Sequence, residues 1–144
     1  MQRITGVDSK VRIIASVITS NVFCANSTNY ISTNKNDESM YYLLGVINSK
    51  LINFYFKQTS TNTNVTSKEI AKFPIKISDL AIKRRIGDLS HQVYELKKNN
   101  SLSDTTSIEQ EIDRLVYHLY GLTYDEVKIV DPENHITEEE YNKA

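Results

Sequence analysis

The sequence predicts an α+β domain, in which a small, mostly antiparallel sheet packs on a buried helix and an antiparallel helical hairpin follows. Three observations predict it. β-branched residues dominate positions 11–18, apolar residues between positions 40 and 55 recur at helical spacing, and two later segments share a spacing typical of paired helices. With 144 residues, of which 40% are hydrophobic and 24% charged, the chain fits a single globular domain.

The sheet is predicted from residues 3–32. Residues 11–18 form a β-branched run that partly alternates between apolar and polar, as strands do. Shorter runs at 22–24 and 30–31 add two expected strands, and polar clusters at 19–21 and 26–29 supply turns between them.

A buried helix is predicted over residues 39–56, with a cap expected within 34–37. The polar segment 57–72 follows and shows no periodicity. A long loop in a compact domain is commonly functional. Residues 1–77 are therefore expected to form a β-rich region that contains this helix and this loop. The apolar residues that predict the helix are Met40, Leu43, Leu44, Ile47, Leu51, Phe54 and Tyr55.

Residues 78–130 predict a helical hairpin and a short helix within the same domain. Ser78 is the expected N-cap, the segments 106–109 and 123–126 match the capping-box pattern, and Gly121 suits a helix C-terminus. Residues 131–144 are expected to form an acidic tail, with one more helical turn at 137–140. Two apolar seams predict the hairpin: Ile82, Ile86, Leu89, Val93 and Leu96, then Ile108, Ile112, Leu115 and Leu119.

Charge is distributed unevenly along the chain. Residues 1–100 carry 14 basic and 7 acidic side chains, whereas residues 101–144 carry 3 basic and 11 acidic ones. Such asymmetry favours a polyanion-binding body with an acidic tail, and a merely dipolar soluble protein is the open alternative.

Several classes of function find no support in the sequence. No apolar run reaches the length of a membrane span and no signal peptide is visible, so a cytoplasmic protein is expected. Cys24 is the only cysteine, which excludes an internal disulfide. The three histidines lie far apart, and no phosphate loop, dinucleotide-binding fingerprint or nucleophile elbow is present. We expect no catalytic residue, metal ligand or cofactor site in this chain.

A nucleic-acid interface is the best-supported site. Lysine and arginine contact phosphates, whereas asparagine, glutamine, serine and threonine can bond to base edges. For the cations at 83–85, a solvated outer helix face is the alternative. The candidate phosphate contacts are Arg12, Lys57, Lys68, Lys72, Arg84 and Arg85. The candidate base contacts are Gln58, Thr59, Ser60, Asn62 and Asn64.

Three segments, in this order, carry a resemblance to a known family. They are YLLGVINSKLINFYFK at 42–57, IAKFPI at 70–75 and IDRLVYHLYGLT at 112–123. Together they resemble the TaqI-like C-terminal specificity domains of Type IIG restriction–modification enzymes and related adenine methyltransferases. The first segment is also similar to a helix of Type I specificity subunits. Within it, Leu51 is expected to be buried and Asn48 or Ser49 to support a neighbouring strand.

The resemblance implies sequence-specific recognition of double-stranded DNA on behalf of a parent enzyme. The expected partner is an adenine methyltransferase domain that uses S-adenosylmethionine, with or without a nuclease. This chain has no Asn-Pro-Pro-Tyr motif and starts close to the RIT segment at 3–5, so it is expected to be a C-terminal fragment. Two alternatives stay open: a protein–protein or dimerisation module acting through the hairpin, and an inactive remnant of a restriction system.

Overall fold

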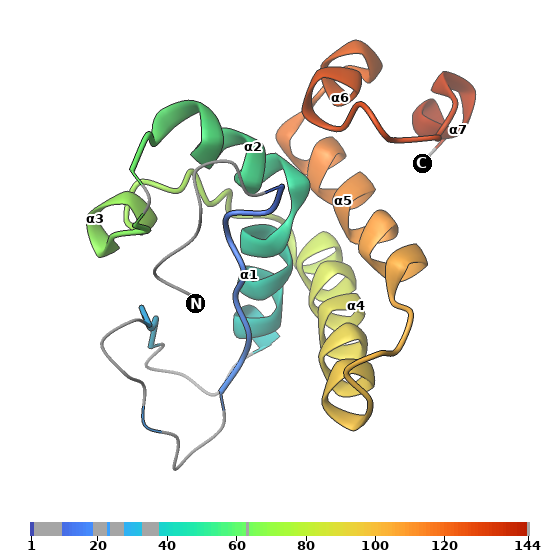
Figure 1. Cartoon of the computed structure of the whole chain (residues 1–144). Helices are drawn as coiled ribbons and strands as arrows, with labels where there is room; N and C mark the ends of the chain where they lie inside the picture. The colour runs from blue at the N-terminus through green and yellow to red at the C-terminus, as the bar shows by residue number, and fades with distance from the viewer. Residues whose placement is uncertain (2–9, 19–22, 24–27, 33–37, 63, 144) are drawn as a thin grey trace.

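The computed structural model describes residues 1, 10–18, 23, 28–32, 38–62 and 64–143, and the structural statements below concern these residues. They form seven helices, with α4 and α5 side by side and antiparallel, and α1 against α4 (Figure 1). In chain order the helices are α1 Glu38–Asn48, α2 Lys50–Thr59, α3 Ser67–Ile70, α4 Leu80–Asn99, α5 Thr106–Tyr120, α6 Tyr124–Val130 and α7 Glu138–Asn142.

The prediction of a sheet is wrong. Apart from isolated bridge residues at Thr28 and Asn64, the described part of the chain contains no strand. The β-branched run at 11–18 is not helical, but it lies along α1 and α2 and bonds to asparagine side chains of these helices instead of to a second strand (Figure 1). Of the expected partner strands, residues 22 and 24 lie outside the described residues, and residues 30–31 are irregular and exposed. β-propensity favours extended backbone, but a sheet also needs a neighbouring strand.

The helix predicted over 39–56 is in fact two helices that meet at Ser49. Ser49 has extended dihedral angles (φ −60°, ψ 152°), so it cannot continue α1. Its hydroxyl donates to the Val46 carbonyl at 2.7 Å and accepts from the Ile52 N–H at 3.3 Å. One side chain therefore satisfies the end of α1 and the start of α2. The expected cap at 34–37 lies outside the described residues.

The segment 57–72 is not a continuous loop. Helix α2 continues to Thr59, and α3 occupies Ser67–Ile70. A capping box starts α3: the Thr66 hydroxyl accepts from the Glu69 N–H, while the Glu69 carboxylate accepts from the Thr66 N–H. Among the described residues of this segment, the parts outside helices are thus 60–62, 64–66 and 71–72.

The hairpin is formed by α4 and α5, and their apolar seams make the core together with α1 and α2. Two boundaries differ from prediction. Asp79, rather than Ser78, caps α4, and Thr105 precedes α5 without the capping box expected at 106–109. Gly121 ends α5 with φ 74°, as expected. The core residues include Val46, Ile52, Phe56, Ile86, Leu89, Ile112, Val116 and Leu119.

Gly45 allows α1 to approach α4 closely. A Cβ at this position would lie 2.3 Å from the Ser90 Oγ and 2.8 Å from the Ile86 Cγ2. Both distances are shorter than van der Waals contact, so only glycine fits at this helix crossing.

The acidic segment 131–144 packs on the rest of the chain through Tyr141. This side chain lies in a second core with Tyr117 and Val127, and its hydroxyl donates to the Leu122 carbonyl at 2.8 Å. The His118 ring stacks on Tyr141 with centroids 4.2 Å apart. Burial lowers the pKa of His118. A neutral, packed imidazole is therefore the state that this site favours.

Candidate nucleic-acid interface

The N-terminal segment is attached to the helices by two asparagines that bind its backbone. The Asn53 Oδ1 accepts from the N–H groups of Arg12 and Ile13 at 2.9 and 2.8 Å, and its Nδ2 donates to the Ile13 carbonyl at 3.3 Å. Asn48 binds the N–H and the carbonyl of Ala15 at 2.8 and 2.9 Å. Each amide thus does what a neighbouring strand would do, which is to satisfy backbone donors and acceptors.

Arg12 is buried and connects this segment to the chain after α2. Its side chain is among the largest that are fully buried, and its guanidinium lies 4.8 Å from the centre of the Phe56 ring. The guanidinium donates to the carbonyls of Ser60, at 3.4 Å, and of Asn62. Its position is that of an internal support for residues 60–62.

Ser60 is also buried, and it ties α2 to α3. Its hydroxyl donates to the Glu69 carboxylate, which also accepts from the Thr66 N–H and hydroxyl. Burial raises the pKa of Glu69, but these hydrogen bonds outweigh burial, so the pKa lies below its usual value. A charged Glu69 therefore holds Ser60 and Thr66 at the start of α3.

The other predicted residues of this region are exposed and cluster around the end of α2. Gln58 and Thr59 occupy its last turn, and Asn62 and Asn64 follow in the short connection to α3. The cations of this end are Lys57, Lys68 and Lys72, all exposed. The Lys57 ammonium donates to the Lys10 carbonyl. We call this set of seven exposed residues the α2–α3 face: Lys57, Gln58, Thr59, Asn62, Asn64, Lys68 and Lys72.

Arg84 and Arg85 lie on another element, the start of α4. Both are exposed, and Arg85 pairs with Glu111 of α5 at 2.5 Å. The sequence placed them on the first helix of the hairpin, and the structure does so too.

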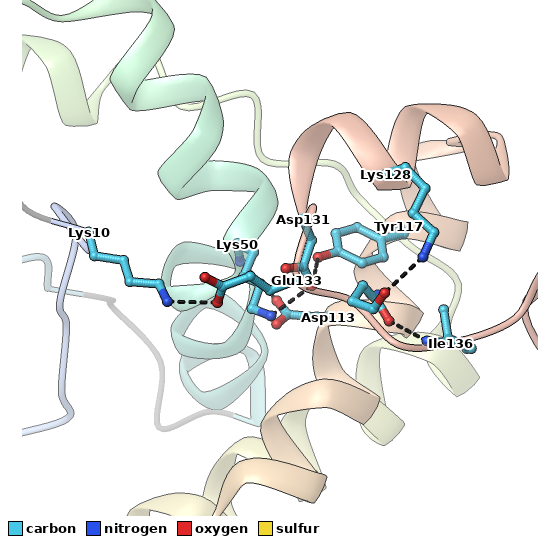
Figure 2. Close-up of polar contacts among 9 residues, drawn as sticks. Lys10, Lys50, Asp113, Tyr117, Lys128, Asp131, Glu133 and Ile136 are labelled. Atoms are coloured by element: carbon cyan, nitrogen blue, oxygen red, sulfur yellow. Dashed lines mark hydrogen bonds and ion pairs between the residues drawn. The ribbon is translucent and has the colours of Figure 1, made fainter.

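A polar cluster that the sequence did not indicate lies where α2 begins. The Lys50 N–H donates to the Asp113 Oδ1 of α5 at 2.8 Å, and the Lys50 ammonium pairs with Asp131 at 2.7 Å. The Tyr117 hydroxyl reaches the same Asp131 at 3.4 Å, and Lys10 pairs with Glu133 nearby (Figure 2). Both aspartates are buried, so α2 is connected to the C-terminal helices through carboxylates in low dielectric.

Burial raises the pKa of Asp113 to about 7, although the Lys50 N–H and ammonium favour the charged form. Asp131 and Glu109 raise it further. The carboxyl group borders a pocket of about 530 Å³ between the N-terminal segment, α2 and α5. Water can therefore exchange its proton.

This shift predicts how the D113N variant differs from the wild type in stability. Between the unfolded pKa of 3.8 and about 7, the native state binds the proton and the unfolded state does not. The wild type should therefore lose on the order of 2–4 kcal/mol of unfolding free energy from this group as pH rises through that range. In urea titrations, the unfolding free energy of D113N relative to that of the wild type should increase up to about pH 7. Above that pH the difference between the two proteins should stay constant. A difference that does not change with pH would contradict the shift.

Within the described residues, no group of three or more histidine, cysteine, aspartate or glutamate side chains is placed to hold a metal ion. In the same part of the chain, no helix combines the length and the apolar character needed to cross a membrane.

The comparison with known families defines the class of protein. The model of the TaqI-like C-terminal specificity domain matches residues 2–75, half of the chain, which includes the asparagine-anchored segment, α1, α2 and α3. The chain belongs to this family of restriction–modification specificity domains, which bind DNA and are non-catalytic by themselves. No curated protein and no solved structure matches the chain.

Proposed function

We propose that this chain recognises a specific sequence of double-stranded DNA and places it for a separate catalytic domain. The observation that carries the proposal is the position of the α2–α3 face. Exposed amide and hydroxyl side chains at the end of α2 and in the connection to α3 lie in the same family-matched region as three exposed lysines. Neighbouring phosphate contacts and base contacts are what sequence-specific binding requires.

In this proposal the residues have three roles. Lys57, Lys68 and Lys72 contact phosphates. Gln58, Thr59 and Asn64 face base edges, whereas the Asn62 amide binds the Glu69 carboxylate within the chain. Arg12 and Ser60 do not contact DNA, because both are buried. They hold in place the backbone that carries the base contacts. Arg84 and Arg85 provide further positive charge for DNA that extends along α4.

The partner domain that fits this role is an adenine methyltransferase using S-adenosylmethionine, with or without a nuclease. The support is the resemblance of residues 42–57, 70–75 and 112–123 to specificity domains of such enzymes. Dimerisation through the hairpin has less support, because the seam residues Ile86, Leu89 and Ile112 are buried within this chain.

Removing two of the lysines tests the phosphate contacts. The double variant K68Q/K72Q should bind every duplex more weakly, and the slope of log affinity against log salt should fall by about 2, since each lost phosphate contact removes nearly one counterion. The measurement is fluorescence anisotropy of the full chain with a labelled duplex at several salt concentrations. K143Q, directly after α7, is the matched control, because Lys143 pairs with Glu139 on another part of the surface. An unchanged slope in the double variant would remove these lysines from the interface.

A further inference from the structure

The cluster at the start of α2 carries a further inference, which rests on the proposed function. Helix α2 is the element that carries the proposed base contacts at its far end, Gln58 and Thr59. Its first turn is held by two groups: the Ser49 hydroxyl, which accepts from Ile52, and the Asp113 carboxylate, which accepts from the Lys50 N–H. The first turn of a helix has no partners of its own for these donors, so such groups decide where the helix begins and how it is aimed.

Ser49 breaks the helix between α1 and α2, so the direction of α2 does not follow from that of α1 alone. A helix of ten residues is about 15 Å long. A tilt of roughly 10° at its start would therefore move its end by about 2.6 Å, whereas a recognition site must hold its groups to within about 0.5 Å. A hydrogen bond at Lys50, at the start of α2, therefore affects the position of the base contacts at the end of the helix.

The groups that hold Lys50 come from outside the family-matched residues. Asp113 belongs to α5 and binds the Lys50 N–H at 2.8 Å, and Asp131 follows α6 and binds the ammonium at 2.7 Å (Figure 2). Asp113 is 7% and Asp131 6% exposed, so water does not compete well for these bonds. We propose that Asp113 is a positioning residue for DNA recognition. By accepting a hydrogen bond from the Lys50 N–H, it sets the direction of α2 relative to the C-terminal helices.

The charges around Asp113 agree with this role. Lys50 faces it from α2, Asp131 faces it from the end of α6, and Glu109 lies one turn away on α5. Lys10, Lys57 and Glu133 line the same pocket, and Tyr117 lies on the same helix. A buried carboxylate among three other acids is costly for packing alone. The Asp113 carboxyl group accepts a hydrogen bond from the start of α2, which an apolar residue of similar size cannot do.

Two variants of Asp113 separate positioning from packing. D113L keeps the branching at Cγ, adds some bulk and removes the acceptor, whereas D113N keeps the size and an oxygen that can accept from Lys50. E109Q is the matched control, since Glu109 lies on the same helix and accepts from the Thr105 hydroxyl rather than from α2. A fourth variant, K50M, cuts only the tie to Asp131 at a half-exposed ammonium. K50M should fold even if D113L does not.

The experiment uses the full chain and two readouts. The first is amide hydrogen exchange of Lys50. The second is the ratio of affinities for a duplex selected by the wild type from a random pool and for a scrambled duplex of equal length. For D113L we expect at least tenfold faster exchange and at least a tenfold loss of discrimination, with an unchanged salt slope. D113N should restore both, E109Q should change neither, and K50M should lose about threefold in discrimination.

Full discrimination by folded D113L would overturn the positioning role. If D113L does not fold, full discrimination by D113A, which also removes the acceptor of the Lys50 N–H but adds no bulk, would overturn it. Unchanged exchange at Lys50 in D113L would overturn it too. Failure of the proposed function looks different: the wild type itself would not discriminate between duplexes, while the exchange of Lys50 would still respond to Asp113.

Discussion

Replacing Asn53 by leucine is expected to lower the free energy of unfolding by about 3–5 kcal/mol. The leucine fills the space but leaves the N–H groups of Arg12 and Ile13 and the Ile13 carbonyl without partners in a buried place. Each unsatisfied buried group costs roughly 1–3 kcal/mol. Small domains are stable by only about 5–15 kcal/mol, so this is a large fraction of the total. Urea denaturation followed by circular dichroism measures it.

Asn48 provides the matched control for this prediction. It makes the same kind of paired bond to the backbone of Ala15, but at an exposed position where water can replace the amide. N48L should therefore cost about 1 kcal/mol or less. Equal losses in N48L and N53L would mean that burial of the N-terminal segment on α2 does not contribute as described.

Replacing Gly45 by alanine is the second large effect, with an expected loss of about 2–3 kcal/mol. The added methyl group would overlap the Ser90 Oγ and the Ile86 Cγ2, so α1 and α4 must move apart. Overpacking of this kind exceeds the gain of about 1 kcal/mol that alanine brings to a helix interior. Thermal or urea unfolding of G45A against the wild type is the measurement.

The double variant G45A/S90A tests the cause of that loss. It removes the atom nearest to the new methyl group, so part of the lost stability should return, while the contact with Ile86 keeps the recovery incomplete. G121A is a useful contrast: a Cβ there has nothing within 4 Å, and its cost of roughly 1–2 kcal/mol comes from the left-handed backbone alone. A G45A variant as stable as the wild type would show that the helices are not in close contact at this crossing.

The helices could be predicted from the sequence because each has a local cause. Apolar periodicity indicates α1, α2, α4 and α5, and the pair Thr123 and Glu126 forms the capping box that starts α6. The same pattern occurs at Thr66 and Glu69 and could have predicted α3. The sheet was predicted wrongly because residues 11–18 have the composition of a strand, while their backbone partners, Asn48 and Asn53, lie 33–41 positions away.

The site was harder to predict, because burial decides the role of a polar residue. Arg12 and Ser60 have the chemistry of a DNA contact, but their packing on Phe56 and Glu69 depends on the folded structure. Asn48 was expected to support a neighbouring strand, and it does bind the extended backbone at Ala15. One feature of the sequence could have indicated Asp113: it is an acid directly after the apolar seam residue Ile112. In the structure it lies on the side of α5 that contacts α2.

Selection of duplex DNA from a random pool by the full chain tests the central claim most directly. At a salt concentration where the chain still binds duplex DNA, successive rounds should enrich one short sequence. A variant in which Gln58 and Asn64 are replaced by alanine should lose or change that sequence while keeping the salt slope of the wild type. A pool that stays random at every salt concentration at which DNA is bound would contradict the assignment of sequence recognition to this chain.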